Sequence, residues 1–244
     1  MRAKIITVGF DGPNRVGKGT QCIRLQKWLA DQEIPSLIIR GAGSRKGSGH
    51  QPGDPKSLWW REVNRWLHTP QASCHDWNIS AYRLARELLV WRDRVLLNWV
   101  KSSGKEFGVL MVDRSLLSRT MIPRAMGLAD IAHNLYPEQT RLKGRRISPE
   151  LVCPDVIFNL TAPLGILRTR LDPGDPKYQF RKKVITETYP WFKDAVTYLP
   201  EHLQSRVVEI DSSRDIEVVF SDVLAVLLTH FDCLKRLDDP NHDS

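Results

Sequence analysis

A glycine-rich segment near the N-terminus has the residue types and the spacing that bind phosphate. The run Gly12-Pro-Asn-Arg-Val-Gly-Lys-Gly-Thr20 follows a short apolar stretch and precedes a helical pattern, which is the setting that a Walker A loop requires. In such a loop, glycines let successive N–H groups point at phosphate oxygens, and the N-terminus of the following helix adds its dipole. The segment therefore predicts a binding site for the phosphates of ATP.

Single residues of this loop carry separate predictions. Lys18 has the length to reach the β- and γ-phosphates. Gly19 stands where the strict motif has Ser or Thr, so the hydroxyl near the phosphates and Mg²⁺ is expected from Thr20. The residues expected to contact ATP are Gly12, Pro13, Asn14, Arg15, Val16, Gly17, Lys18, Gly19 and Thr20. A glycine turn without phosphate chemistry is the alternative.

The elements that must position this loop alternate along the chain. Short apolar runs predict five buried strands, at 4–10, 36–40, 109–112, 155–160 and 207–210. Helical spacing of apolar residues appears at 17–32, 79–102, 163–171 and 214–229, and in a long region that Pro190 interrupts. This alternation predicts an α/β fold with a parallel sheet covered on both faces. Ligands of such sheets bind at the carboxyl ends of the strands, where the loops 12–20, 41–56 and 113–119 are expected.

The chain is expected to form one domain over residues 1–237, with a small lid at about 172–182 and a polar tail at 238–244. No run of eighteen apolar residues predicts a membrane span. The four cysteines are far apart and the seven histidines lack ligand spacing, which favours reduced thiols in a cytoplasm, that of a host if the source is viral, and no zinc site.

The charge of the chain is its unusual bulk property. Thirty-six Lys and Arg against 28 Asp and Glu give a net charge of +8 and a pI near 9.5. A kinase for free nucleotides needs positive charge only in its cleft, whereas a chain-wide excess favours a polyanionic partner such as DNA. A role in solubility alone is the other interpretation, and the oligomeric state stays open, a homodimer included.

Several motifs together resemble the thymidylate kinase family of P-loop nucleotide kinases. The stretch Phe10 to Gln21 resembles the opening of these enzymes, and its Gly-Lys-Gly-Thr form is also seen in adenylate-kinase-like enzymes. Val112-Asp-Arg-Ser115 is similar to their Asp-Arg motif, and Asp93-Arg94 matches the position of a substrate-binding arginine. Pro154-Asp155 precedes Arg168-Thr-Arg170 and a lid-like segment with Lys177 and Arg181. These matches keep the family's order from residue 5 to about 228.

The resemblance implies a three-layer P-loop kinase fold with a five-stranded parallel sheet, and it implies roles for particular residues. Arg15, Lys18 and the lid cations would hold the triphosphate of ATP and stabilise the transferring phosphoryl group. Asp113, alone or with Asp11, would hold Mg²⁺, and either carboxylate is a candidate to accept a proton from an alcohol acceptor. Substrate binding would fall to Arg40, Arg94 and Arg114. A structural Asp113–Arg114 pair and a solvated Arg94 are the alternatives.

The sequence departs from the family in the region that would bind the acceptor. The basic, glycine-rich stretch that begins at Arg40 replaces an Arg-Glu-Pro-Gly-Gly-type segment, Asn14 replaces an aspartate, and Ser115 replaces an aromatic residue. A neutral Asn14 would not repel a phosphodiester at the 3′ position. With the net charge, these changes resemble the phage 5-hydroxymethyluracil DNA kinase branch, in which the acceptor is a hydroxymethyl group of a base in DNA.

That hypothesis adds expectations and leaves two alternatives. The target base would leave the stack. The basic segments 40–46 and 141–146 would follow the DNA backbone or form solvated surface, and Trp59 or Trp60 would stack on a base or pack in the core. The alternatives are a kinase of free dTMP or another deoxynucleoside monophosphate, and a P-loop protein that binds ATP and nucleic acid without catalysis.

Overall fold

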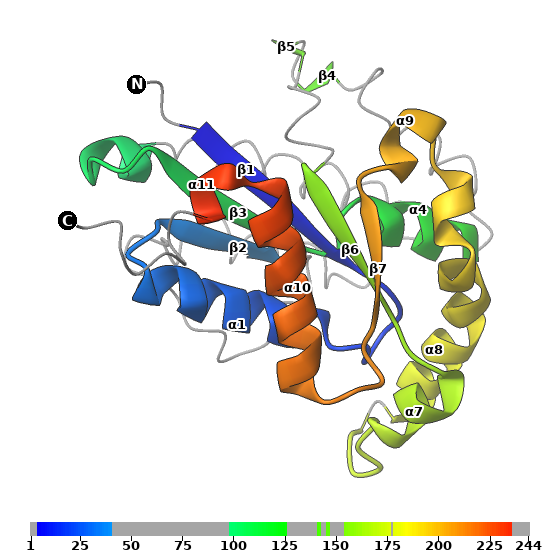
Figure 1. Ribbon diagram of the computed structural model, residues 1–244. Coiled ribbons are helices and arrows are strands. Elements are labelled where there is room, and N and C mark those ends of the chain that lie inside the picture. Colours follow the sequence, from blue (N-terminus) through cyan, green and yellow to red (C-terminus); the bar gives the residue numbers. More distant parts are fainter. Residues whose placement is uncertain are drawn as a thin grey trace.

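A computed structural model describes residues 4–40, 98–125, 141–142, 145–146, 154–176 and 178–235. Its centre is a five-stranded sheet in the order β2-β3-β1-β6-β7, in which every neighbouring pair is parallel. The strands are β1 (Lys4–Asp11), β2 (Ser36–Arg40), β3 (Phe107–Asp113), β6 (Val156–Thr161) and β7 (Val207–Asp211). The five strands expected from the sequence are thus confirmed, together with their parallel arrangement (Figure 1).

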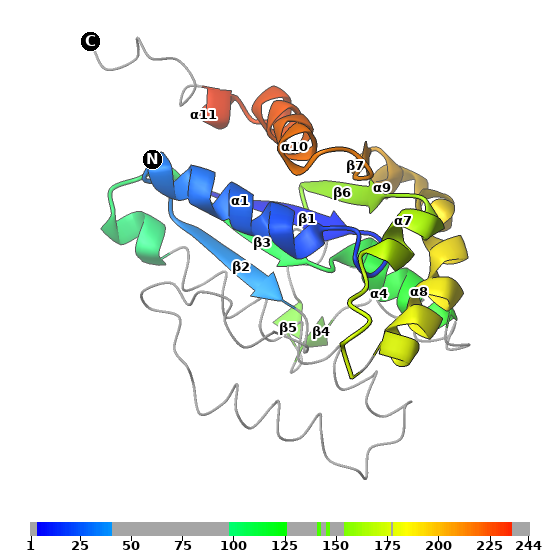
Figure 2. The same ribbon diagram turned by 90° about the horizontal axis from the view of Figure 1, so that it is seen from below.

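One face of the sheet is covered by the first helix and the last long helix. These are α1 (Lys18–Asp31) and α10 (Ile216–His230), which lie on the same side of the sheet in Figure 2. Their buried residues Leu25 and Val223 belong to one apolar cluster with the strand residues Val8 and Phe158. Burial of this apolar surface is the main force that holds the two helices on the sheet.

The opposite face is covered by α4 (Leu116–Ala125), by the end of α8 (Tyr178–Lys193) and by the segment that follows α8. Leu117 and Met121 of α4 pack with Ile157 of β6 and Phe192 of α8. Ile157 lies between Val156 and Phe158, which face the first cluster, as the two-residue alternation of a strand requires. The three layers expected from the sequence are therefore present.

The remaining described elements are short. They are β4 (Arg141–Leu142), β5 (Arg145–Arg146), α7 (Leu164–Thr169), the 3₁₀ helix η2 (Ala195–Tyr198), α9 (Glu201–Gln204) and α11 (Asp232–Lys235). The basic stretch 141–146, for which the sequence predicted no element, contains the antiparallel pair β4–β5. Of the helix predicted at 79–102, only residues 98–102 are described, and they are helical.

Pro190 does not interrupt the helical region as the sequence suggested. The helix α8 runs through it and ends at Lys193. A proline inside a helix removes one backbone hydrogen bond, and its ring crowds the carbonyl group four residues earlier. Burial of Ile185, Thr188 and Phe192 keeps α8 packed in spite of this cost. The interruption expected there was wrong because tertiary packing outweighs the local cost of the proline.

Within the ranges that the structure describes, no helix has both the length and the hydrophobicity that a membrane span requires.

The described cysteines, Cys22 and Cys233, are free thiols. Cys74 and Cys153 lie outside the described residues.

Candidate functional site

The loop that the sequence predicted to bind phosphate, residues 12–20 and here called the phosphate loop, begins after β1 and runs into α1. Several of its residues have positive φ. Gly12, Arg15 and Gly17 have φ values of 125°, 67° and 109°. A Cβ atom on Gly12 would lie 2.2 Å from the carbonyl oxygen of Leu160, so only glycine fits where the loop passes the end of β6. Arg15 takes a conformation that is uncommon for a non-glycine residue, and such strain is typical of functional loops.

Lys18 is the buried cation of this loop. Its side chain is 6% exposed, and Nζ donates to the carbonyl oxygens of Gly12, at 2.9 Å, and Pro13, at 2.7 Å. Burial, followed by the positive charge of Arg114, lowers the pKa of Lys18 to about 8, although Asp113 acts in the opposite direction. The ammonium group is thus held at the loop with little solvent around it, and an anion placed there would gain from the low dielectric.

The N-terminus of α1 is open to an anion. Its N-cap residue, Gly17, supplies no side-chain cap, and the first turn contains no acidic residue. Thr20, the predicted hydroxyl, is exposed in that turn. Uncapped N–H groups at a helix N-terminus favour negative charge, so the loop, Lys18 and this helix end together fit a polyphosphate.

Asp113 and Arg114 lie beside the loop, as the sequence suggested. In the sheet register Asp113 pairs with Phe10, and the N–H of Arg114 donates to the Phe10 carbonyl at 2.9 Å. A Cβ on Gly19 would lie 3.3 Å from Oδ2 of Asp113, which places this carboxylate at the first turn of α1. Within the part of the chain that the structure describes, no residue makes a hydrogen bond or an ion pair with the Asp113 carboxylate.

Arg114 connects its turn to the phosphate loop. Its φ of 73° turns the chain after β3, and its Nη2 donates to Oδ1 of Asn14 at 2.5 Å. The amide of Asn14 therefore acts as an acceptor for Arg114. The structure brings Asn14, Lys18, Asp113 and Arg114 together, while their catalytic and substrate-binding roles remain proposals.

Asp11 has a different environment from Asp113. It is fully buried, and it accepts hydrogen bonds from the N–H groups of Leu117, at 3.1 Å, and Ser118, at 3.0 Å, and from the hydroxyl of Ser115. Both carboxylate oxygens are engaged at the N-terminus of α4, where negative charge is favoured. The structure thus gives Asp11 a positioning role, and its predicted role as a base or metal ligand stays a prediction that the geometry does not favour.

The replacement of an aromatic residue by Ser115 also has a local explanation. Ser115 is buried and bonded to Asp11, and a Cβ on Gly9 would lie 2.3 Å from its hydroxyl oxygen. The small serine and the bare glycine backbone fit each other. This departure from the family therefore carries less information about the acceptor than the sequence suggested.

The segment at about 172–182 that the sequence predicted to be a lid contains a carboxylate that the sequence analysis did not single out. Asp175 lies 3.6 Å from Arg15 and 3.1 Å from Arg181, measured between the carboxylate Oδ2 and the guanidinium nitrogens. Arg15 and Arg181, both predicted to hold the triphosphate, are thereby brought together. Lys177 lies outside the described residues.

Two further residues near the loop were missed or given another role. Arg170, which the sequence analysis noted only within the Arg168-Thr-Arg170 match, donates to backbone carbonyls behind the loop. Ser212 was not singled out, and its hydroxyl donates to the carbonyl oxygen of Val16. The loop carbonyls that they bond are distant in the sequence, so only the tertiary fold could show these contacts.

Other predicted site residues are not placed. Arg94, Trp59, Trp60 and the loop 41–56 lie outside the described residues. The backbone of Arg40 ends β2 and pairs in register with Asp113, which sets this residue at the carboxyl edge of the sheet. Pro154-Asp155, the match that precedes β6, has a structural contact, because Asp155 accepts a hydrogen bond from the N–H of Thr7 at 2.8 Å.

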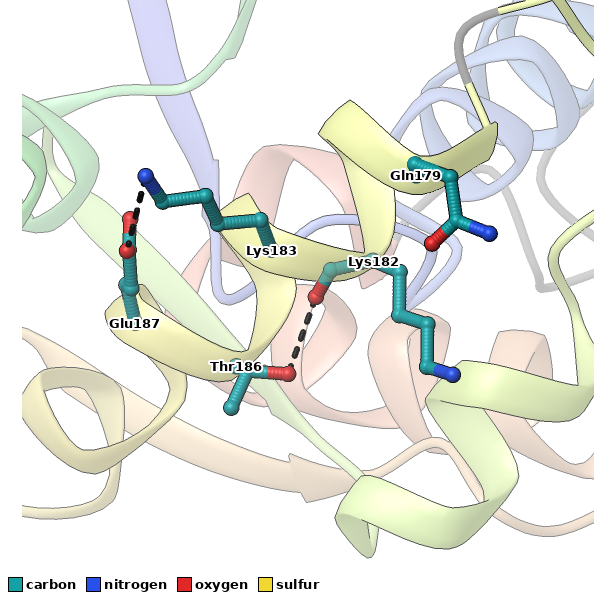
Figure 3. Close-up of a pocket in the computed structure, with 5 residues that line it drawn as sticks. All are labelled: Gln179, Lys182, Lys183, Thr186 and Glu187. Atoms are coloured by element: carbon teal, nitrogen blue, oxygen red, sulfur yellow. Dashed lines mark hydrogen bonds and ion pairs between the residues drawn. The ribbon is translucent and has the colours of Figure 1, made fainter.

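A hollow on the surface of α8 lies apart from these groups. Its lining residues are Gln179, Lys182, Lys183, Thr186 and Glu187 (Figure 3). All five belong to one helix, and Glu187 is paired with Lys183 at 3.7 Å. No residue of the phosphate loop contributes to it, so this hollow is not the candidate site.

The described residues contain no cluster of three or more His, Cys, Asp or Glu side chains that could hold a metal by themselves. The oxygen donors near the loop are Asp113 and Thr20, which suit Mg²⁺ when phosphate oxygens complete its coordination. The residues present therefore fit a magnesium–nucleotide complex.

Comparison with known proteins supports the fold at low sequence identity. No protein-family model matches the chain, and no curated protein matches its sequence. Thymidylate kinase from Candida albicans superimposes with a TM-score of 0.59 at 17% identity, covering 94% of each chain. Thymidylate kinase from Ehrlichia chaffeensis gives 0.53 at 18% identity, covering 92% of this chain and 99% of that one. The expected P-loop kinase fold is thereby confirmed.

Proposed function

We propose that the chain transfers the γ-phosphoryl group of ATP to a pyrimidine deoxynucleotide. The observation that carries this proposal is the convergence of a phosphate loop, its buried Lys18 and the Asp113–Arg114 turn at the carboxyl edge of the sheet. A protein that only binds ATP would need the loop and the lysine. The acidic and basic residues beside them are what phosphoryl transfer adds.

Each residue of this group has a defined task in the proposed reaction. The N–H groups of the loop, Lys18 and Arg15 bind the phosphates and stabilise the charge that develops during transfer. Arg114, fixed by Asn14, orients the acceptor. ATP would supply the phosphoryl group, and Thr20, together with Asp113 through water, would hold the Mg²⁺ that neutralises part of the phosphate charge.

The favoured acceptor is the hydroxymethyl group of 5-hydroxymethyluracil within DNA. In this reaction the hydroxyl oxygen bonds to the γ-phosphorus, the bond from that phosphorus to the bridging oxygen of ADP breaks, and Asp113 accepts the hydroxyl proton. Asp113 suits this task better than Asp11, because the oxygens of Asp11 are engaged by α4.

Charge supports an acceptor within DNA. The chain carries a net +8, and Asn14 puts no carboxylate beside the acceptor. The basic segment 141–146, which contains the strand pair β4–β5, would add to the positive charge that attracts a phosphate backbone.

Two alternatives remain. Phosphorylation of free dTMP is favoured by the structural similarity to two thymidylate kinases. A P-loop protein that binds ATP and nucleic acid without transfer is the second alternative, and the position of Asp113 beside α1 argues against it.

One assay separates these functions. The protein is incubated with Mg²⁺ and γ-labelled ATP together with a duplex containing 5-hydroxymethyluracil, the same duplex with thymine, or free dTMP. We expect label only in the hydroxymethylated duplex. Label in dTMP alone would establish the free-nucleotide kinase, and label in none of the three, with ATP still bound, would favour the non-catalytic protein.

A further inference from the structure

The carbonyl groups of the phosphate loop need hydrogen-bond donors, just as its N–H groups need acceptors. When N–H groups face a bound phosphate, the carbonyls of the same peptides point elsewhere and need donors of their own. Lys18 bonds those of Gly12 and Pro13, and the N–H groups of Thr20 and Gln21 bond that of Gly17 at 2.9 and 3.1 Å. The carbonyls of Arg15 and Val16 are satisfied from outside the loop.

Arg170 is the donor that reaches both of these carbonyls. Its Nη1 lies 3.4 Å from the oxygen of Arg15 and 3.5 Å from that of Val16, and its Nη2 lies 2.7 Å from the carbonyl oxygen of Ser212. One planar guanidinium thus bridges the phosphate loop and the turn between β7 and α10. Only arginine has a rigid fork that can donate in two directions at once.

Ser212 completes this contact. It is 5% exposed, and its hydroxyl donates to the Val16 carbonyl at 2.7 Å. The turn that carries it is itself ordered, because the hydroxyl and N–H of Ser213 donate to Asp211 at 2.6 and 2.9 Å and thereby lower the pKa of Asp211.

We propose that Arg170 and Ser212 are positioning residues that hold the phosphate loop in its binding conformation from its carbonyl side. This inference rests on the proposed binding of a triphosphate by the loop. Arg15 has a strained backbone, and the contacts of Arg170 and Ser212 at Arg15 and Val16 oppose its relaxation. Without them the N–H groups lose their alignment, so that any polyphosphate binds more weakly, whatever base is attached to it.

The test compares two probes, Mg-ATP and inorganic tripolyphosphate with Mg²⁺, by calorimetry on the full chain. For Arg170→Ala we expect both probes to bind about tenfold more weakly or worse, by the same factor, since a hydrogen bond from a charged group is lost at the loop. Ser212→Ala should weaken both probes equally but less. The two effects should be non-additive in the double variant, because both residues bond Val16.

Two control variants remove an arginine without touching the loop. Arg206→Ala removes an arginine–carbonyl bond of 3.3 Å, to Pro154, at the opposite edge of the sheet. Arg168→Ala removes a cation two residues away, which bonds Thr186 on α8. Both should bind the two probes within about twofold of the unmodified protein, because surface changes away from the site have small effects.

Other outcomes would overturn the inference in distinguishable ways. Unchanged affinity in Arg170→Ala and Ser212→Ala would show that the loop holds itself. A loss for ATP but not for tripolyphosphate would make Arg170 a contact for the nucleoside. If Arg170→Ala does not fold, Arg170→Lys and Ser212→Ala decide the question by the same comparison. An unmodified protein that binds neither probe would refute the proposed function as well.

Discussion

At the residue scale, two aspartates that end neighbouring strands have opposite environments. Asp11 ends β1 with both oxygens bonded to the start of α4, whereas Asp113 ends β3 beside the first turn of α1. Burial with full hydrogen bonding makes a carboxylate structural, whereas a carboxylate that none of the described residues engages, beside a cation, is suited to chemistry. We therefore expect Asp11 to contribute to folding stability and Asp113 to contribute to activity.

We predict opposite effects for the two amide substitutions. Asp11→Asn replaces an acceptor of three hydrogen bonds with a group that must turn one N–H toward donors, and should cost about 2–3 kcal/mol of unfolding free energy. Asp113→Asn should change stability by less than about 1 kcal/mol but lower phosphoryl transfer by about a hundredfold or more. Denaturant unfolding and the labelled-ATP assay measure the two effects, and equal loss of stability in both variants would contradict this division.

Lys18 gives a prediction about pH. Its pKa of about 8 lies below the ordinary value of 10.5, so the unfolded chain binds more protons between these values and folding stability should rise with pH there. Triphosphate affinity should instead fall as pH rises through about 8, because the ammonium loses its charge. Unfolding and calorimetry between pH 7 and about 10 test both signs.

The matched variant for this prediction is Lys18→Met, which keeps the apolar stem. It should remove the pH-dependent rise in stability that Lys18 contributes and abolish triphosphate binding at all pH values while the fold remains. Normal turnover in Lys18→Met would refute the assignment of the loop.

At the element scale, the loop works because strand, turn and helix are fitted to each other at glycines. A Cβ atom added to Gly12 would lie 2.2 Å from the carbonyl oxygen of Leu160 in β6. Gly17 is the N-cap of α1 and has a left-handed conformation. The segment after β7 then supports the loop through Ser212. The conformation of the loop therefore depends on contacts with β6 and with the segment after β7, and not on its own residues alone.

We predict that Gly12→Ala is far more damaging than Gly165→Ala. The added methyl at Gly12 meets a backbone oxygen that cannot move freely and also strains a positive φ, so triphosphate binding should be lost along with about 2 kcal/mol or more of stability. Gly165 lies in α7 with nothing within 4 Å of an added Cβ, and alanine there should stabilise by up to about 1 kcal/mol. Thermal unfolding and calorimetry measure both, and similar behaviour of the two variants would contradict the packing argument.

At the scale of the whole molecule, the sheet order places the site. β1 lies between β3 and β6, so the loops after β1 and β3 leave the sheet side by side at its carboxyl edge, where open α/β sheets bind ligands. The thymidylate kinases from Candida albicans and Ehrlichia chaffeensis share this fold at 17–18% identity.

The net charge of +8 leads to a prediction at this scale. If DNA is the acceptor, phosphate contacts release counterions, and affinity for a duplex should fall by tenfold or more between about 50 and 200 mM salt. Fluorescence anisotropy with the thymine duplex measures this dependence, and affinity that scarcely changes with salt would contradict backbone contacts. Tripolyphosphate binding, which uses a few buried groups, should change less.

The sequence by itself determined the strands, the phosphate loop and the residues that face it, because β-branched runs, glycine spacing and a following helix are local signals. The tertiary structure alone decided that Asp11 anchors α4, that Pro190 lies inside a helix, and that Arg170 and Ser212 support the loop. These contacts join residues as much as 196 positions apart. Local patterns cannot encode them, because which side chain meets which carbonyl depends on how the sheet brings distant loops to one edge.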